Sequence, residues 1–412
     1  MGLRRLSENM KKPELLAPAG DLKRCMTAIR YGADAVYIGG RSFSLRSRAS
    51  NFTMDDIREA CAFAREHGSV IHVTVNIIPR EEDFDGLREY LRDLQDAGVH
   101  AVIVASPAIM KLTREAAPKL EIHCSTQLSV TNADAARFFR DQLHADRVVL
   151  ARECTMSDVR KITAVCEAQT EAFIHGGMCV NYSGRCTLSN RMTLRDANRG
   201  GCAQSCRWLY HLYEKDKELS DEDLLTIGSR DLMCAEWIWP LMEAGVSSFK
   251  IEGRMKTEYY VASIVSAYRH LIDEIYENRG PLSDERMAYH RRQIMFAENR
   301  QTCDGFYAGR ADEKSLIYHM TSNADVNHDF LGTVRKYNRE KGTAMIETRN
   351  LFSLNDTVQI LSPYGVHDDF RITSIKDAEG GKLDVSRRPM VTVEIPVPFE
   401  VHEEDILRRA RP

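Results

Sequence analysis

Residues 32–40 read Gly-Ala-Asp-Ala-Val-Tyr-Ile-Gly-Gly, a turn followed by a short, apolar and partly β-branched run. The pattern returns at residues 98–106 (Gly-Val-His-Ala-Val-Ile-Val-Ala-Ser), 144–152 (His-Ala-Asp-Arg-Val-Val-Leu-Ala-Arg) and 245–253 (Gly-Val-Ser-Ser-Phe-Lys-Ile-Glu-Gly). Runs of this kind are typical of strands buried on both faces of a parallel sheet. The four copies therefore indicate a repeated α/β architecture.

The sequence predicts eight such strands, with helical periodicity between them, as at Asp55–Glu66. Parallel strands need crossovers of this kind, and eight is the number that closes a (β/α)8, TIM-like barrel. The alternative is an open doubly wound sheet, but no Gly-x-Gly-x-x-Gly phosphate turn follows the first strand, which favours the barrel. The predicted strands are Glu14–Pro18, Ala35–Gly39, Val70–Asn76, Ala101–Ser106, Ile122–Gln127, Arg147–Glu153, Ala172–Gly176 and Ser248–Gly253.

A small all-β domain is predicted after the barrel. From Phe330 onward the chain alternates short apolar and polar runs with turn residues between them, which is typical of a small β-barrel of about five to seven strands. We expect a (β/α)8 domain over residues 12–317, a boundary in the polar stretch 318–328 and a β-barrel over residues 329–410. A cysteine-rich insertion at about residues 177–229 precedes the eighth strand, and long loops at that end of a barrel carry function.

Four cysteines lie in this insertion: Cys179, Cys186, Cys202 and Cys206. Four thiolates on a glycine-rich loop suit an iron–sulfur cluster or a structural zinc ion. Zinc ribbons prefer Cys-x-x-Cys knuckles, and the gaps of six, fifteen and three residues contain none, which favours a 4Fe–4S cluster. Cys234 is a fifth nearby candidate, so it competes with Cys206 for the role of fourth ligand.

Polar side chains stand where the predicted strands end. A polar residue at that position is costly unless something uses it, so the ensemble predicts a polar, ligand-binding mouth. His175 fits a proton carrier, a hydrogen-bond donor to an anionic substrate, a neighbour of the cluster or, equally, a buried structural histidine. The strand-end residues are Asn76, Ser106, Gln127, Arg152, Glu153, His175, Glu252 and Arg254.

Several cations follow the same strands, among them Arg41, Arg152, Arg254 and Lys256. Guanidinium groups bind carboxylates and phosphates with matched geometry, so these residues predict a positive pocket for an anionic small molecule or a nucleic-acid backbone. The alternative is a solvated rim, which explains most single arginines.

Composition narrows the classes of function. The chain has 412 residues, 43% of them hydrophobic, and a net charge of −4, so no global basic bias indicates nucleic acid, although a local basic surface is compatible with it. The N-terminus lacks the apolar core of a signal peptide and no run approaches the ~18 apolar residues of a membrane span, so we expect a cytoplasmic protein without membrane contact. In that reducing compartment eleven cysteines favour a metal centre over disulfides. The sequence contains neither a Gly-x-Ser-x-Gly elbow nor a His-Glu-x-x-His zinc motif for hydrolysis.

The run from Glu171 to Ser189 resembles the signature of the collagenase-like peptidase family thirty-two (U-type). It has Glu-x-Phe, then Cys-x4-Gly-x-Cys, then an aliphatic residue and serine; Gly177 stands where the signature prefers serine or alanine. Further matches lie at residues 14–21, 125–127 and 249–256, and the resemblance covers about residues 12–280. The β-rich tail resembles the C-terminal domain of the same family.

The resemblance implies an activity other than proteolysis. Members of the family are oxygen-independent hydroxylases of RNA bases or of ubiquinone precursors that carry a 4Fe–4S cluster, and the RNA branches depend on prephenate. Chain length, the tail and the run Cys202–Trp208 look most like the branch that hydroxylates carbon 5 of the tRNA wobble uridine. A ribosomal RNA cytidine hydroxylase and the peptidase of the family name stay as alternatives.

The resemblance also implies roles for particular residues. Cys179, Cys186, Cys202 and Cys206 are the expected cluster ligands, and prephenate and the tRNA anticodon loop are the expected ligands of the mouth, with a related partner subunit left open. Phe43, Tyr182 and Trp208 are candidates to stack on the base, against a plain packing role. We expect His175, Glu153, Arg152 and Glu252 to be catalytic, and Asn76, Gln127, Arg254, Lys256 and Arg41 to bind substrate.

Overall fold

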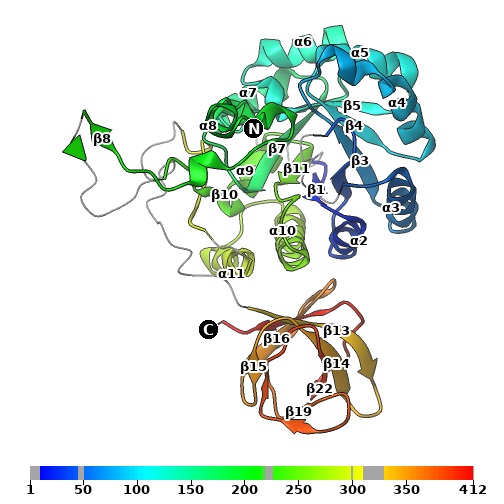
Figure 1. The fold of residues 1–412 in the computed structure, drawn as a ribbon, viewed down its shortest axis with the longest axis vertical. Helices are drawn as coiled ribbons and strands as arrows, with labels where there is room; N and C mark the ends of the chain where they lie inside the picture. The colour runs from blue at the N-terminus through cyan, green and yellow to red at the C-terminus, as the bar shows by residue number, and fades with distance from the viewer. Residues whose placement is uncertain are drawn as a thin grey trace.

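The computed structural model describes residues 10–44, 51–215, 217–218, 226–297, 300–309 and 329–411. Its larger domain is built on eight parallel strands in the order β1 to β7 and then β11. Strand β11 pairs in parallel with both β1 and β7, which closes the barrel (Figure 1). The predicted eight-stranded TIM-like barrel is therefore confirmed. The strands are β1 (Glu14–Pro18), β2 (Ala35–Gly39), β3 (Val70–Val75), β4 (Ala101–Val104), β5 (Glu121–Cys124), β6 (Arg147–Val149), β7 (Gln169–Gly176) and β11 (Ser248–Ile251).

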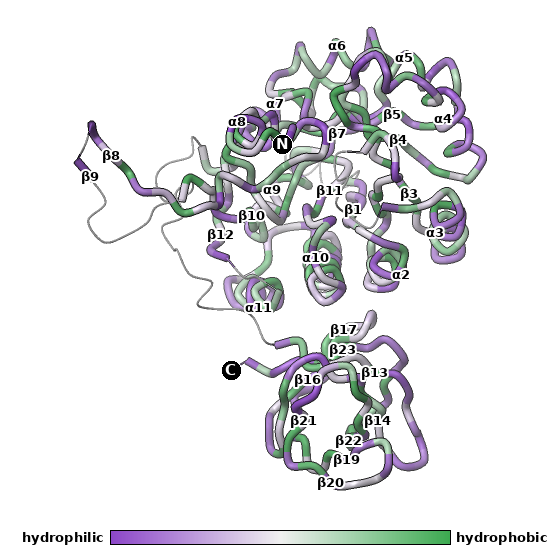
Figure 2. Tube along the Cα trace, in the orientation of Figure 1, coloured by the Kyte–Doolittle hydropathy of each residue, from purple (hydrophilic) through white to green (hydrophobic). Residues whose placement is uncertain are grey.

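Helices surround the barrel and alternate apolar and polar residues along their length, as the green and purple stretches in Figure 2 show. Two of them begin with capping boxes at Thr53 and Thr155. Each threonine side chain accepts from the backbone N–H of the aspartate three residues later, and the side chain of that aspartate accepts from the threonine backbone N–H. The helices outside the insertion are α2 (Leu22–Arg30), α3 (Met54–Glu66), α4 (Leu87–Asp96), α5 (Pro107–Ala116), α6 (Ala133–Leu143), α7 (Met156–Val165), α9 (Ile238–Glu243), α10 (Glu258–Asn278) and α11 (Asp284–Met295).

Several strands end earlier than the sequence predicts. Strand β6 stops at Val149, and β5 gives way to a 3-10 turn, Thr126–Leu128. The polar residues expected on strand ends therefore lie on the loops that follow, where the backbone can turn them toward the mouth. Short strands that were not predicted extend the sheet at β7: β10 (Asp231–Met233) pairs antiparallel with the end of β7, and β12 (Thr302–Cys303) pairs in parallel with β10. Two more, β8 (Tyr213–Glu214) and β9 (Lys217–Glu218), pair with each other in the insertion.

The inside of the barrel is charged, whereas the space between strands and helices is apolar. Arg147 donates to both carboxylate oxygens of Glu14, at 2.6 and 3.0 Å, and to Glu171 at 3.1 Å. Lys250 donates to the other oxygen of Glu171 at 2.7 Å. These four side chains, named here the floor network, place two positive and two negative charges beneath the mouth.

The second domain is an antiparallel β structure with its own apolar core (Figure 1). The run predicted as one strand at residues 370–375 is divided, because Phe370–Arg371 pairs with β16 whereas Ile375–Lys376 pairs with β22. The predicted boundary at 318–328 lies outside the described residues. Its strands are β13 (Phe330–Asn338), β14 (Thr343–Thr348), β15 (Phe352–Ser353), β16 (Thr357–Ser362), β17 (Gly365–Val366), β18 (Phe370–Arg371), β19 (Ile375–Lys376), β20 (Lys382–Leu383), β21 (Val385–Ser386), β22 (Thr392–Pro396) and β23 (Ile406–Arg409).

The two domains touch through specific contacts. The Tyr31 hydroxyl donates to the carbonyl oxygen of Leu361 at 3.2 Å, and the rings of Tyr259 and Phe330 stack at 5.0 Å. In the part of the chain that the structure describes, each helix falls short of the length or apolar character needed to cross a bilayer.

Candidate functional site

A cavity of about 640 Å³ opens where the barrel strands end and the insertion folds over them. Barrel loops and the insertion both contribute to its wall, so residues far apart in sequence meet there. Its size lies within the range of small-molecule sites. All four cysteines of the insertion line it, together with seven of the predicted mouth residues: Asn76, Gln127, Arg152, Glu153, Glu252, Arg254 and Lys256.

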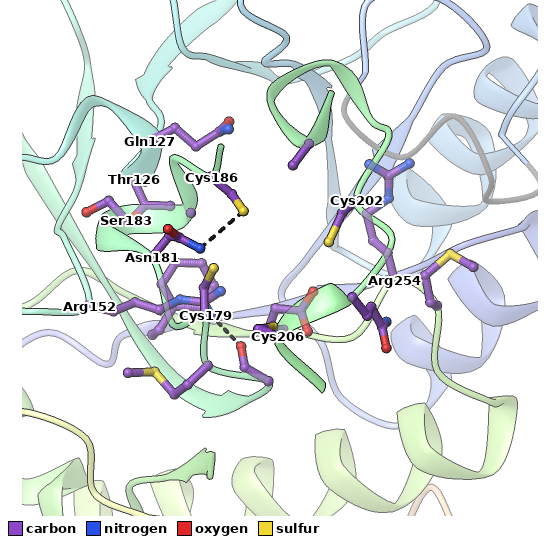
Figure 3. Close-up of a pocket in the computed structure, with 18 of the residues that line it drawn as sticks. Thr126, Gln127, Arg152, Cys179, Asn181, Ser183, Cys186, Cys202, Cys206 and Arg254 are labelled. Atoms are coloured by element: carbon purple, nitrogen blue, oxygen red, sulfur yellow. Dashed lines mark hydrogen bonds between the residues drawn. The ribbon is translucent and has the colours of Figure 1, made fainter. Parts of the chain in front are cut away.

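The four thiols come from two sides of this cavity. Figure 3 shows the sulfurs of Cys179 and Cys186 on one side of an open space and those of Cys202 and Cys206 on the other. Cys186 is buried, Cys179 and Cys206 are half-buried and Cys202 is exposed. Among the described residues, no three histidine, cysteine or acidic side chains are grouped as a single metal ion requires. The structure thus brings the four thiols to the wall of one cavity.

Barrel residues fix the first pair of cysteines. Both oxygens of Glu153 accept from Ser183, one from its backbone N–H at 2.7 Å and one from its hydroxyl at 2.9 Å. Ser183 has a positive φ of 48°, so the carboxylate holds a turn that serine rarely adopts. Arg185 Nε donates to the carbonyl oxygen of Gln127 at 2.6 Å. The loop between Cys179 and Cys186 is therefore tied to two barrel loops.

Polar groups also reach the cysteines themselves. Asn181 Nδ2 lies 3.1 Å from Cys186 Sγ, a hydrogen bond that favours a thiolate (Figure 3). The Asn198 side chain accepts from the Cys186 backbone N–H at 3.3 Å and donates to its carbonyl oxygen at 3.0 Å. Burial raises the pKa of the Cys179 thiol and that of Cys206, and the neighbouring thiols add to this. The site therefore needs a cation or metal to hold several thiolates at once.

Cys234 does not reach the cavity. Its side chain is completely buried, and its backbone N–H donates to the carbonyl oxygen of Ile174 at 2.9 Å, on the outer side of β7. Burial raises the pKa of its thiol strongly. The structure thus groups Cys206, rather than Cys234, with the other three cysteines.

The predicted cations differ in how firmly they are engaged. Arg254 is 4% exposed and donates to the side chains of Ser44, Thr74 and Asn51 at 2.9 to 3.2 Å. Arg152 donates to the carbonyl oxygen of Gly177, and its guanidinium lies 3.9 Å from the centre of the Phe173 ring. Both arginines line the cavity while holding its walls. Arg41, in contrast, is exposed and lies outside the set of residues that line the cavity.

His175 lies behind the cavity wall instead of in it. The register between β7 and β11 shifts so that Lys250 faces Phe173 but Ile251 faces His175, which leaves Ile174 as an extra residue. A bulge of this kind re-aims the side chains that follow. His175 is therefore fully buried against α10, with Nδ1 at 3.3 Å from the Tyr268 hydroxyl. This is the position of the structural histidine rather than of a proton carrier at the mouth.

Four further residues named from the sequence also lie outside the set that lines the cavity. Phe43 packs on Tyr90 with ring centres 5.3 Å apart, while Tyr182 and Trp208 are exposed on the insertion. Ser106 is 7% exposed and precedes α5 as its N-terminal flanking residue. The expected stacking roles therefore have no support from the placement of these rings.

Other cavity residues were missed. Lys250 forms part of the floor, with its Nζ 4.7 Å from the centre of the Tyr37 ring. Arg207 and Arg300 line the wall. Lys250 had a signal in the sequence, since a lysine inside a buried apolar strand is costly unless it is paired. Arg207 and Arg300 had none, because both lie on irregular segments.

The floor network favours the charged forms of Glu171 and Arg147. Burial opposes the charge of Glu171, but Lys250 and Arg147 more than offset it and lower its pKa to about 2. For Arg147, burial likewise opposes the charge, and Glu14 and Glu171 raise its pKa above its ordinary value. Glu171 and Arg147 are therefore both ionised near neutral pH.

Residues 20–316 match the description "Peptidase family U32", and residues 326–408 match "Peptidase family U32 C-terminal domain". The chain is 39% identical over 407 residues to "tRNA hydroxylation protein P1" of Bacillus subtilis (strain 168), covering 97% of this chain and 96% of that protein. It is 40% identical over 270 residues to "23S rRNA 5-hydroxycytidine C2501 synthase" of Escherichia coli (strain K12), covering 66% of this chain and 41% of that protein. It is 34% identical over 371 residues to "Collagenase" of Porphyromonas gingivalis (strain ATCC BAA-308 / W83), covering 86% of this chain and 88% of that protein.

Proposed function

Because this chain belongs to peptidase family U32, and matches a tRNA hydroxylation protein over 97% of its length, we propose that it hydroxylates tRNA. In its finer form the proposal is a prephenate-dependent, oxygen-independent hydroxylation of the wobble uridine at carbon 5, supported by a 4Fe–4S cluster. The observation that carries it is the meeting of Cys179, Cys186, Cys202 and Cys206 at the wall of one cation-rich cavity.

The donor set fits an iron–sulfur cluster. Four cysteine thiolates are the usual ligands of a 4Fe–4S cluster, and hydrogen bonds to sulfur, such as that from Asn181 to Cys186, tune its reduction potential. Such a cluster supplies one-electron transfer when it is bound. The cationic Arg152 lies near Cys179 and lowers the pKa of its thiol, which opposes the effect of burial.

The cavity offers room for a base beside the thiols. Enzymes that modify a base in RNA act on single-stranded or flipped-out nucleotides, so the uridine would leave the anticodon loop and enter the mouth. Asn76 and Gln127 line the wall and are suited to hydrogen-bond the edge of a pyrimidine. Prephenate carries two carboxylates, and Arg152, Lys250 and Arg254 are the deep cations that favour such a ligand.

The carboxylates of the cavity divide into two roles. Replacing the hydrogen at carbon 5 by a hydroxyl group taken from water releases two protons, one from the base and one from water, and two electrons, which pass to an oxidant other than dioxygen. Glu153 holds the turn at Ser183 with both oxygens, so its role is to position the cysteines. We assign the removal of the proton to Glu252, which lines the cavity on the loop after β11.

A second candidate is hydroxylation of a ribosomal RNA cytidine, which the 40% identity to the 23S rRNA enzyme favours. That match covers only 41% of the larger relative, whereas the tRNA relative matches from end to end and includes the C-terminal domain. Proteolysis is a third reading of the family name and of the relative named as a collagenase. The three activities leave different products and can be separated directly.

The test is nucleoside mass spectrometry of tRNA and ribosomal RNA from cells that lack this chain and any redundant relative. We expect 5-hydroxyuridine derivatives of tRNA to disappear and to return with the wild-type chain, but not with the C179S/C186S variant. Unchanged tRNA nucleosides would refute the tRNA assignment, and loss of a hydroxylated cytidine from ribosomal RNA would move the protein to the second candidate. Protein purified without oxygen should be brown; a colourless protein with one zinc ion would contradict the cluster.

A further inference from the structure

Three cations converge on one buried carboxylate at the edge of the cavity. Asp231 is 1% exposed, and its oxygens lie 3.4 Å from Arg207 Nη2, 3.9 Å from Lys256 Nζ and 3.6 Å from Arg300 Nη1. Building on the proposed function, we propose that these four side chains, the Asp231 cluster, bind a backbone phosphate of the RNA whose base enters the cavity.

The charge balance of the cluster favours an anion. Three positive charges face one negative charge, which leaves a surplus of two, and among the described residues these cations have no other ion pair within 4.0 Å. Lys256 and Arg300 lie beyond hydrogen-bond distance of Asp231, so their donors are not consumed by it. Asp231 holds the cations together without neutralising them, whereas the floor network beneath the cavity is balanced.

The backbone is shaped to bring these side chains together. At Gly228 a β-carbon would lie 2.8 Å from Arg207 Cδ, so the chain needs glycine there for the arginine to pass. At Gly253, where φ is 156°, a β-carbon would lie 3.1 Å from Lys256 Cγ and 2.7 Å from Tyr260 Cε1. Lys256 Nζ rests 4.8 Å from the centre of the Tyr260 ring. The Asp231 cluster is thus a built feature to which four separate segments contribute.

The position of the cluster distinguishes a phosphate from a small co-substrate. The side chains of Arg207, Lys256 and Arg300 are 16%, 27% and 32% exposed, whereas that of Lys250 on the floor is 6% exposed. A nucleotide that inserts its base into a cavity leaves its phosphates at the opening, while a small acid is enclosed with the reacting groups. All three cations also line the cavity, and Arg207 directly follows Cys206, so a phosphate held here sets the base beside the thiols.

The salt dependence of RNA binding tests this assignment. The probe is tRNA purified from cells that lack the chain. Its binding constant for the protein loaded with the iron–sulfur cluster is measured between ~50 and ~200 mM salt. Each phosphate contact to single-stranded RNA contributes about 0.7 to the slope of the logarithm of the binding constant against the logarithm of the salt concentration. For the K256Q/R300Q variant we expect the slope to fall by about 0.7 for each phosphate released. The R88Q/R160Q variant is the matched control, since it removes the same charge from outer helices where each arginine pairs with a single glutamate.

Each outcome decides the proposal. A slope for K256Q/R300Q that equals that of R88Q/R160Q overturns it. A wild-type slope together with a higher concentration of prephenate needed for activity also overturns it, and would assign the Asp231 cluster to binding of the co-substrate. If the double variant loses its visible absorbance, the single variant R300Q replaces it, because Arg300 is the most exposed of the three cations. For R300Q we expect about half the change in slope. If the wild-type protein binds no tRNA, the proposed function itself fails. If the wild-type protein binds tRNA and the variants show the same slope, only the phosphate-binding role of the Asp231 cluster fails.

Discussion

Replacing Arg147 by methionine tests whether the charged floor of the barrel is a necessary part of the fold. The guanidinium side chain is 4% exposed, and its partners are the fully buried Glu171 and the partly buried Glu14. Methionine has a similar length and keeps most of the packing, so the change removes mainly the charge and its hydrogen bonds. Two carboxylates then share the single positive charge of Lys250.

The expected loss of stability follows from that imbalance. Removing one partner of a buried ion pair costs about 3–5 kcal/mol, because the other partner stays buried without compensation. Lys250 still pairs with Glu171 at 2.7 Å, and Glu14 retains some solvent contact, so we expect about 3 kcal/mol at pH 7.

The deficit should shrink in acid. In the wild-type protein the pKa of Glu171 is lowered to about 2, so its contribution to stability is present above the pKa of an unfolded glutamate and is lost as the pH falls toward 2. Without Arg147 one cause of that lowering is gone and the native pKa rises. The native variant therefore takes up this proton at a higher pH than native wild type does, so the deficit shrinks as the pH falls into the range in which Glu171 titrates.

Urea denaturation followed by circular dichroism at pH 7 and pH 3 measures both quantities. The matched control is Arg160→Met on α7, where an arginine that is 52% exposed pairs with Glu243 at 3.1 Å and should contribute less than about 1 kcal/mol. A loss for Arg147→Met no larger than that of the control, or a loss that is equal at both pH values, would refute the reasoning.

Three further predictions concern the cysteine site. Cys206→Ser should abolish most of the visible absorbance of anaerobically purified protein while Cys234→Ser leaves it intact, and the reverse result would reassign the fourth ligand. Asn181→Leu removes the hydrogen bond to Cys186 and should lower the reduction potential by roughly 40 mV, the equivalent of about 1 kcal/mol, which voltammetry can measure against wild type. Gly176→Ala places a β-carbon 2.4 Å from a backbone oxygen at a φ of 106°, so it should cost about 2–3 kcal/mol in urea denaturation; an unchanged midpoint would contradict this strain.

The sequence was informative where periodicity carries the structure. The eight strands and the separate β domain follow from apolar runs and turns, because burial on both faces demands such runs. The cysteine quartet was found for a similar reason, since its spacing is compact and lies between two recognisable strands. Most of the predicted mouth residues do line the cavity, although they lie on the loops that follow the strands. The predicted strands extended too far along the chain.

The misplaced residues share a different physical origin. His175 was expected at the mouth because it stands where the seventh predicted strand ends, and a bulge in β7 re-aims its side chain. Nothing in a local pattern reveals such a bulge, which depends on pairing with a strand more than seventy residues away. Arg207 and Arg300 come together at Asp231, the first residue of the unpredicted strand β10, and no periodicity encodes a contact among these three distant segments.

Closure of the barrel has a consequence for how the protein is assembled in the cell. Strands β7 and β11 pair directly with one another, although the segment with all four clustered cysteines lies between them in the chain. The hydrogen bonds that seal the barrel are therefore independent of whether those cysteines hold a metal. Under the proposed function, the barrel would close first and the finished scaffold would receive its 4Fe–4S cluster later. Oxidative loss of the metal would then leave a folded protein that can be repaired rather than one that must be degraded.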